Sequence, residues 1–138
     1  METHKKFNLT KKNFNKLKKE KLNKLFNICL KERITLATLF MTSHLCYRIY
    51  NEELFDDPEL DWDIIFLIVF WISTKFIICE KYYTVYIVYD NADIKYDIDG
   101  IKSVEIAILQ ALDYNLGHNK IWKNAVPENE FPDYIWFD

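Results

Sequence analysis

Residues 62–77 read WDIIFLIVFWISTKFI, within the most apolar segment of this chain of 138 residues. No charged side chain lies between Asp63 and Lys75. A segment that is apolar nearly all round is typical of a helix that is enclosed by other helices. We therefore predict a buried central helix over residues 62–77. Asp61 is suited to cap this helix because its carboxylate can accept hydrogen bonds from the first backbone N–H groups.

The composition favours one all-α domain. The length is sufficient to bury a core, and a hydrophobic content of 50% argues against disorder. Only two glycines are present, so few positions suit the tight turns of β-hairpins. The apolar run is shorter than the roughly 20 residues that cross a bilayer, and no secretory leader is recognisable. We expect no membrane span and an intracellular location in the cytoplasm, the nucleus or both.

The cysteines indicate the redox compartment of the chain, and the charge distribution indicates which partners it could bind. Cys29, Cys46 and Cys79 are odd in number and lie in apolar segments, which is typical of buried free thiols in a reducing compartment. Residues 1–33 carry a net charge of +8, and the remaining residues carry −11. A basic segment could bind nucleic acid, a membrane surface or an acidic partner. We favour a solvated helix face, because leucines interrupt the lysines at helical spacing.

Further helices are predicted on both sides of the central one. Apolar residues recur at helical spacing in residues 14–30, 34–50 and 101–114. Residues 82–89 (YYTVYIVY) have strand propensity, but a lone strand would have no pairing partner, so we predict a short helix there. Gly117 is expected to terminate the last helix in a left-handed conformation. The predicted organisation is a basic arm (1–13), a helical domain (14–117) and a C-terminal strap (118–138).

The chain lacks the motifs of an enzyme. It has neither a nucleophile elbow nor a glycine-rich phosphate loop. His44 and Cys46 are two residues apart, but no second ligand pair has the spacing of a zinc site. We interpret His44 as a partly buried helix residue. We predict no catalytic residue, no metal, no cofactor and no small-molecule substrate, which leaves a protein-binding module.

Three phrases occur in an order that resembles the cyclin box: TLATLFMTSHL, LDWDIIFLIVFWISTKF and VEIAILQALDYNLG. In that family the buried third helix ends in a phrase like Ser73-Thr74-Lys75-Phe76. The fifth helix carries a pattern matched by Glu105, Ile108, Leu109 and Leu112. The resemblance covers about residues 20–117, and it implies a five-helix fold in which residues 82–89 are helical.

The resemblance also implies a partner. Cyclins bind the C-helix of a cyclin-dependent kinase and push it inward, so that the kinase's Lys–Glu pair forms. In cyclins, the lysine and glutamate that correspond to Lys75 and Glu105 pair with each other and hold backbone groups of the kinase. The residues that correspond to the apolar socket for the kinase helix are Ile72, Phe76, Leu109, Tyr114 and Leu116. A single-box cyclin of this kind is what a large DNA virus or a compact parasite would encode, and its partner could be a host kinase.

Physical chemistry gives two interpretations of Lys75. An ammonium that leaves water needs a counter-charge, which Glu105 could supply from a neighbouring helix. Alternatively, Lys75 could place its stem on the core and its ammonium in water. The residues alone favour the second interpretation, and the resemblance favours a partner-binding role.

The sequence departs from the cyclin pattern in its first helix. Residues 17–25 (LKKEKLNKL) lack the apolar Trp-containing patch with which some cyclins recruit substrates. Two alternative functions remain open. One is a small helical interaction protein of another class, such as a viral inhibitor of apoptosis or signalling. The other is a cyclin-fold transcription factor that places the basic arm on DNA, although nucleic acid is not the expected partner.

Overall fold

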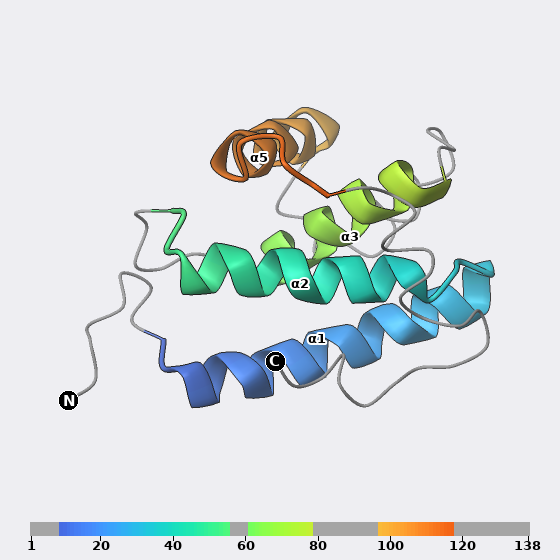
Figure 1. Cartoon of the computed structure of the whole chain (residues 1–138). Helices are drawn as coiled ribbons and strands as arrows, with labels where there is room; N and C mark the ends of the chain where they lie inside the picture. Colours follow the sequence, from blue (N-terminus) through green and yellow to red (C-terminus); the bar gives the residue numbers. More distant parts are fainter. Residues whose placement is uncertain (1–8, 56–60, 79–96, 118–138) are drawn as a thin grey trace.

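A computed structural model of the chain describes residues 9–55, 61–78 and 97–117 (Figure 1). These residues contain no strand and form four helices: α1 (Lys11–Glu32), α2 (Ala37–Asn51), α3 (Trp62–Ile78) and α5 (Ile98–Ala111). The predicted all-α class is confirmed for this part of the chain. The predicted helix at residues 82–89, the strap at 118–138 and Cys79 lie outside the described residues.

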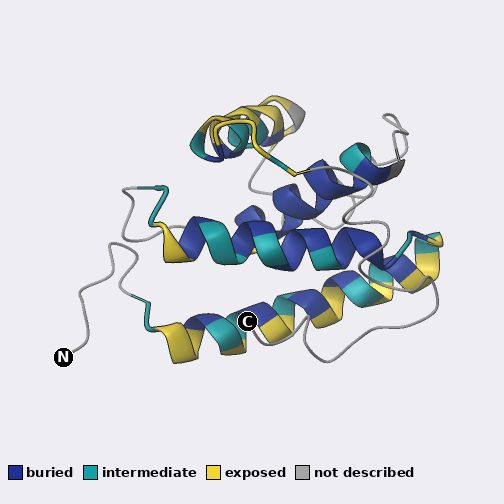
Figure 2. Ribbon diagram, viewed as in Figure 1, coloured by how far each residue is buried: buried dark blue, intermediate teal, exposed yellow. Residues whose placement is uncertain are grey.

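The helix α3 lies at the centre of the described structure, as its sequence predicts. It packs against α1, α2 and α5, and α1 also packs against α2. Figure 1 shows α1 and α5 on opposite sides, with α2 and α3 between them. Within residues 62–77, every side chain is buried except those of Asp63, Lys75 and Phe76 (Figure 2). The surface of α3 is apolar nearly all round, and nearly all of that surface is covered by the rest of the protein.

Aromatic side chains join the start of α1 to α2 and α3. The Phe14 ring stacks on the Tyr50 ring at a centroid distance of 4.2 Å, and the Trp62 ring meets Phe14 edge-on at 5.2 Å. Phe14 has no exposed surface, so its burial contributes about 1.5–3 kcal/mol. The Tyr50 hydroxyl donates to the carbonyl of Leu9 at 2.6 Å. This cluster fixes the three helices at one end of the bundle.

Polar N-caps decide where three of the helices begin. The Thr10 hydroxyl accepts from the N–H of Asn13 at 3.2 Å, so α1 begins three residues before the predicted start. The Asp97 carboxylate accepts from the N–H of Gly100 at 2.7 Å, which also moves the start of α5 three residues earlier than predicted. The predicted cap at Asp61 is confirmed, because its carboxylate accepts from Asp63 N at 3.1 Å.

The predicted start of α2 is wrong. The helix begins at Ala37 and not at Ile34, because residues 34–36 form the link from α1. The hydroxyl of Thr35 accepts from the N–H of Ala37 at 3.4 Å within this link. The end of α2 at Asn51 lies one residue beyond the prediction.

Non-glycine residues in the left-handed region end three of the helices. Arg33 (φ 56°) follows α1, Glu53 (φ 50°) follows α2 and Asp113 (φ 55°) follows α5. Such residues cost about 1–2 kcal/mol each, and glycine would avoid that cost. The predicted role of Gly117 is wrong: it has a positive φ of 78°, but α5 ends at Ala111, six residues earlier. The sequence has only two glycines, and neither follows one of these three helices directly.

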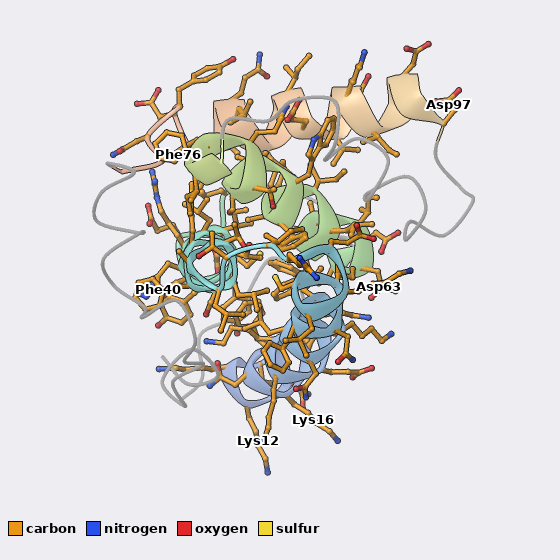
Figure 3. All side chains as sticks on the ribbon, turned by 90° about the vertical axis from the view of Figure 1, so that its right-hand side faces the viewer. Lys12, Lys16, Phe40, Asp63, Phe76 and Asp97 are labelled. Carbon is orange, nitrogen blue, oxygen red and sulfur yellow. The ribbon has the colours of Figure 1, made fainter. Side chains whose placement is uncertain are left out.

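The lysines of α1 divide between the fold and the solvent. Lys12 and Lys16 are exposed and extend away from the molecule (Figure 3). Lys21 pairs with Asp63 of α3. Lys18 is fully buried, and its ammonium lies 5.7 Å from the centroid of the Tyr47 ring. The interpretation of α1 as a solvated basic face therefore holds for its outer side, whereas two lysines belong to the helix packing.

Two cysteines lie in the core as free thiols, as predicted. Burial raises the pKa of Cys29 to about 12, although the Thr38 hydroxyl 3.7 Å from its sulfur opposes part of the rise. Burial also raises the pKa of Cys46 well above its usual value, against the opposing charge of Lys18. Both thiols therefore stay protonated and unreactive at neutral pH.

Candidate functional site

Lys75 and Glu105 meet at the boundary between α3 and α5. The ammonium of Lys75 forms an ion pair with the Glu105 carboxylate. The Lys75 side chain keeps 30% of its surface exposed, whereas the Glu105 side chain keeps only 12%. The pairing expected from the sequence is therefore present. Because the carboxylate is nearly buried, this ion pair depends less on solvent screening than one on the open surface.

Trp71 gives Lys75 a second partner that the sequence analysis did not identify. The ammonium of Lys75 lies 4.2 Å from the centroid of the Trp71 ring, within the range of a cation–π contact. The two residues are four positions apart, so they are neighbours on one face of α3. Trp71 itself is buried, with 3% of its surface exposed. The spacing of the two residues on a predicted helix was the signal that could have revealed the contact.

The apolar site residues lie at different depths. Ile72 is buried in the core, with 3% of its surface exposed, so it supports the surface from below. Phe76, Leu109 and Leu116 are partly buried and pack against the core. Tyr114 is 63% exposed. Ile106, which the sequence analysis did not single out, is 52% exposed on α5 beside Glu105.

Tyr114 lies beyond the end of α5, so its predicted place as the last residue of a helix ending at residue 114 is wrong. Leu116 lies further along the same turn. The Asp113 N–H donates to the Gln110 carbonyl at 2.9 Å, and the Tyr114 N–H donates to the Leu109 carbonyl at 2.8 Å. These two bonds form a Schellman motif, which turns the chain out of the helix. Tyr114 also has a positive φ of 54° and projects from this turn.

Arg48 of α2 reaches this turn from the neighbouring helix. Its guanidinium donates to the carbonyl of Asn115 at 2.9 Å and to that of Leu112 at 3.2 Å. Its Nε lies 3.2 Å from the carboxylate of Glu52, the residue that follows the end of α2. These contacts span 64 and 67 positions of the sequence. No local pattern in the sequence could therefore have indicated them.

Other candidate chemistry is limited in the part of the chain that the structure describes. His44 is partly buried on α2, as interpreted from the sequence. The centroids of the His44 and Phe40 rings are 4.5 Å apart. In residues 9–55, 61–78 and 97–117, no group of three or more His, Cys, Asp or Glu side chains could hold a metal ion. None of the described helices is long and apolar enough to cross a bilayer.

Comparisons with protein-family models, with curated proteins and with solved structures found no match to this chain. The class that the described residues define is a helical protein with a central buried helix and a paired lysine at its edge. Membership of the cyclin family stays a prediction from the three sequence phrases.

Proposed function

We propose that the chain is a cyclin-like regulatory subunit that binds the C-helix of a cyclin-dependent kinase. The observation that carries the proposal is the Lys75–Glu105 ion pair at the α3–α5 boundary, with the Lys75 side chain still partly exposed. Partly buried and exposed apolar side chains on α3, on α5 and in the turn after α5, at Phe76, Leu109 and Tyr114, add a hydrophobic contribution. The order of the three sequence phrases supports the same function.

Lys75 has donor capacity for a partner. An ammonium carries three N–H donors, more than an ion pair with a single carboxylate oxygen of Glu105 can take up. The Trp71 ring and the Glu105 carboxylate hold the ammonium in place, so little side-chain entropy is lost when it binds a further acceptor. Backbone carbonyls at the end of a kinase helix are acceptors of this kind. The lysine thus fixes the register, and the apolar side chains around it supply area.

The catalytic residues in such a complex belong to the kinase. This chain contributes differential binding: it binds the inward position of the C-helix more tightly than the outward position, and it shifts the kinase toward the active state by that difference. A chain that bound the kinase without favouring the inward position would act as a decoy instead.

A pull-down from cell lysate with kinase identification tests the proposal, followed by a phosphorylation assay on the recovered complex. We expect wild-type protein to recover a cyclin-dependent kinase, and Lys75→Ala and Glu105→Ala to lose it. Lys102→Ala is the matched control, because Lys102 is an exposed lysine on α5. Full recovery of the kinase by both site variants would refute the proposal, as would recovery of no kinase by the wild type.

A further inference from the structure

Arg48 holds the turn that carries two residues of the proposed binding surface. It bridges two backbone carbonyls, those of Leu112 and Asn115, on either side of Tyr114. Glu52 binds the third nitrogen of the same guanidinium. All three nitrogens of the side chain are therefore engaged, and the fork has one defined orientation between α2 and the end of α5.

Arg48 brings donors to the turn from outside α5. The turn's own N–H groups bind the carbonyls of Leu109, Gln110 and Leu112. Arg48 adds a second bond at Leu112 and a bond at Asn115. The last turn of α5 contains no basic residue. The turn also places two consecutive non-glycine residues, Asp113 and Tyr114, in the left-handed region. Such a conformation persists where the surrounding structure enforces it.

A lysine at position 48 would not hold the turn in the way that Arg48 does. The two accepting carbonyls lie three residues apart along the turn, and two different nitrogens of the guanidinium bind them. An ammonium carries its three donors at a single point on a flexible stem, so it lacks the separate, fixed nitrogens with which the guanidinium binds Leu112, Asn115 and Glu52.

We propose that Arg48 is a positioning residue for the partner-binding surface. It acts from α2 by fixing the turn at residues 112–116, and it thereby sets where Tyr114 and Leu116 lie relative to Lys75. The inference rests on the proposed function for its binding part, and its structural part stands on the hydrogen bonds alone. Arg48 itself need not touch the partner.

The test uses the full chain and two independent readouts. The first is amide hydrogen exchange in Arg48→Met and Arg48→Lys, followed at Tyr114 and Asn115, whose N–H groups donate within the turn. The second is the Kd for a cyclin-dependent kinase in a double-mutant cycle of Arg48→Met with Tyr114→Ala. Lys102→Met controls for the loss of one positive charge.

We expect exchange at Tyr114 and Asn115 to rise at least tenfold in both Arg48 variants, while exchange at Val69 in the centre of α3 stays within twofold. We expect Arg48→Met to weaken kinase binding at least fivefold in the wild-type background and less than twofold in the Tyr114→Ala background. Equal losses in the two backgrounds, or unchanged exchange in the turn, would overturn the inference. If wild-type protein does not bind the kinase, the proposed function and the binding part fail, and exchange still decides whether Arg48 holds the turn.

Discussion

Lys75 lies with its ammonium 4.2 Å from the centroid of the Trp71 ring, one turn earlier on α3. The same ammonium pairs with Glu105 on α5. A lysine held from two sides has fewer rotamers than one that only extends its stem along the core. Solvation of the ammonium alone therefore does not explain the position of the Lys75 side chain. The ion pair with Glu105 joins α3 to α5.

Removal of Lys75 alone should destabilise the fold. In Lys75→Met the Glu105 carboxylate, only 12% exposed, loses its counter-charge. We expect the free energy of unfolding to fall by about 1–3 kcal/mol. The double variant Lys75→Met/Glu105→Gln should recover part of this loss, because no charge then stays buried without a partner. Urea denaturation measures the stability of both variants. If Lys75→Met were as stable as the wild type, the ion pair would not stabilise the fold.

Glycine at the end of α2 should stabilise the protein. Glu53 has a φ of 50°, in the region where a Cβ atom is unfavourable. We expect Glu53→Gly to raise the free energy of unfolding by about 0.5–1 kcal/mol, which corresponds to a rise in Tm of about 2–6 °C. Glu53→Ala is the control: it removes the same carboxylate but keeps the Cβ atom. If Ala and Gly raise the Tm equally, the backbone explanation fails.

The buried thiols predict a loss of stability in alkali. Burial raises the pKa of Cys29 from 9.0 to about 12. Above pH 9 the unfolded chain therefore loses this proton while the folded chain keeps it, and stability falls by about 1.4 kcal/mol per pH unit until about pH 12. Below pH 9 the thiol is protonated in both the folded and the unfolded chain, so it adds no pH dependence to the stability.

The slope of stability against pH separates this thiol from the other groups that titrate in the same range. Urea denaturation of wild type and Cys29→Ala between pH 8 and pH 10.5 gives the two slopes. We expect a shallower decline in Cys29→Ala, by about 1 kcal/mol per pH unit. Identical slopes would mean that the folded thiol ionises as easily as the unfolded one.

The central features of the fold could be predicted because they depend on local patterns. The apolar run in residues 62–77 indicated the buried helix α3, and Asp61 was recognisable as its cap. Boundaries were missed where a polar side chain began a helix before its apolar pattern, as at Thr10 and Asp97. Gly117 was a misleading signal, because Asp113 takes the left-handed position that usually favours glycine.

The candidate site was predictable only in part. The family resemblance implied the pairing of Lys75 with Glu105, but physical reasoning from the residues alone left it as one of two interpretations. Trp71 was recognisable in principle from its spacing to Lys75. The contact of Arg48 with the turn after α5 could not be predicted, because it depends on how α2 and α5 lie in space.

Exchange of the two charges tests the central claim most directly. The double variant Lys75→Glu/Glu105→Lys can keep the ion pair within the chain but reverses the charge that the surface presents. Its Kd for the kinase, measured by titration calorimetry beside its Tm, separates the two roles of the pair. Our account predicts a Tm within a few degrees of wild type and binding weakened at least a hundredfold. Wild-type affinity in the charge-swapped variant would show that the pair serves only the fold, and would contradict the account.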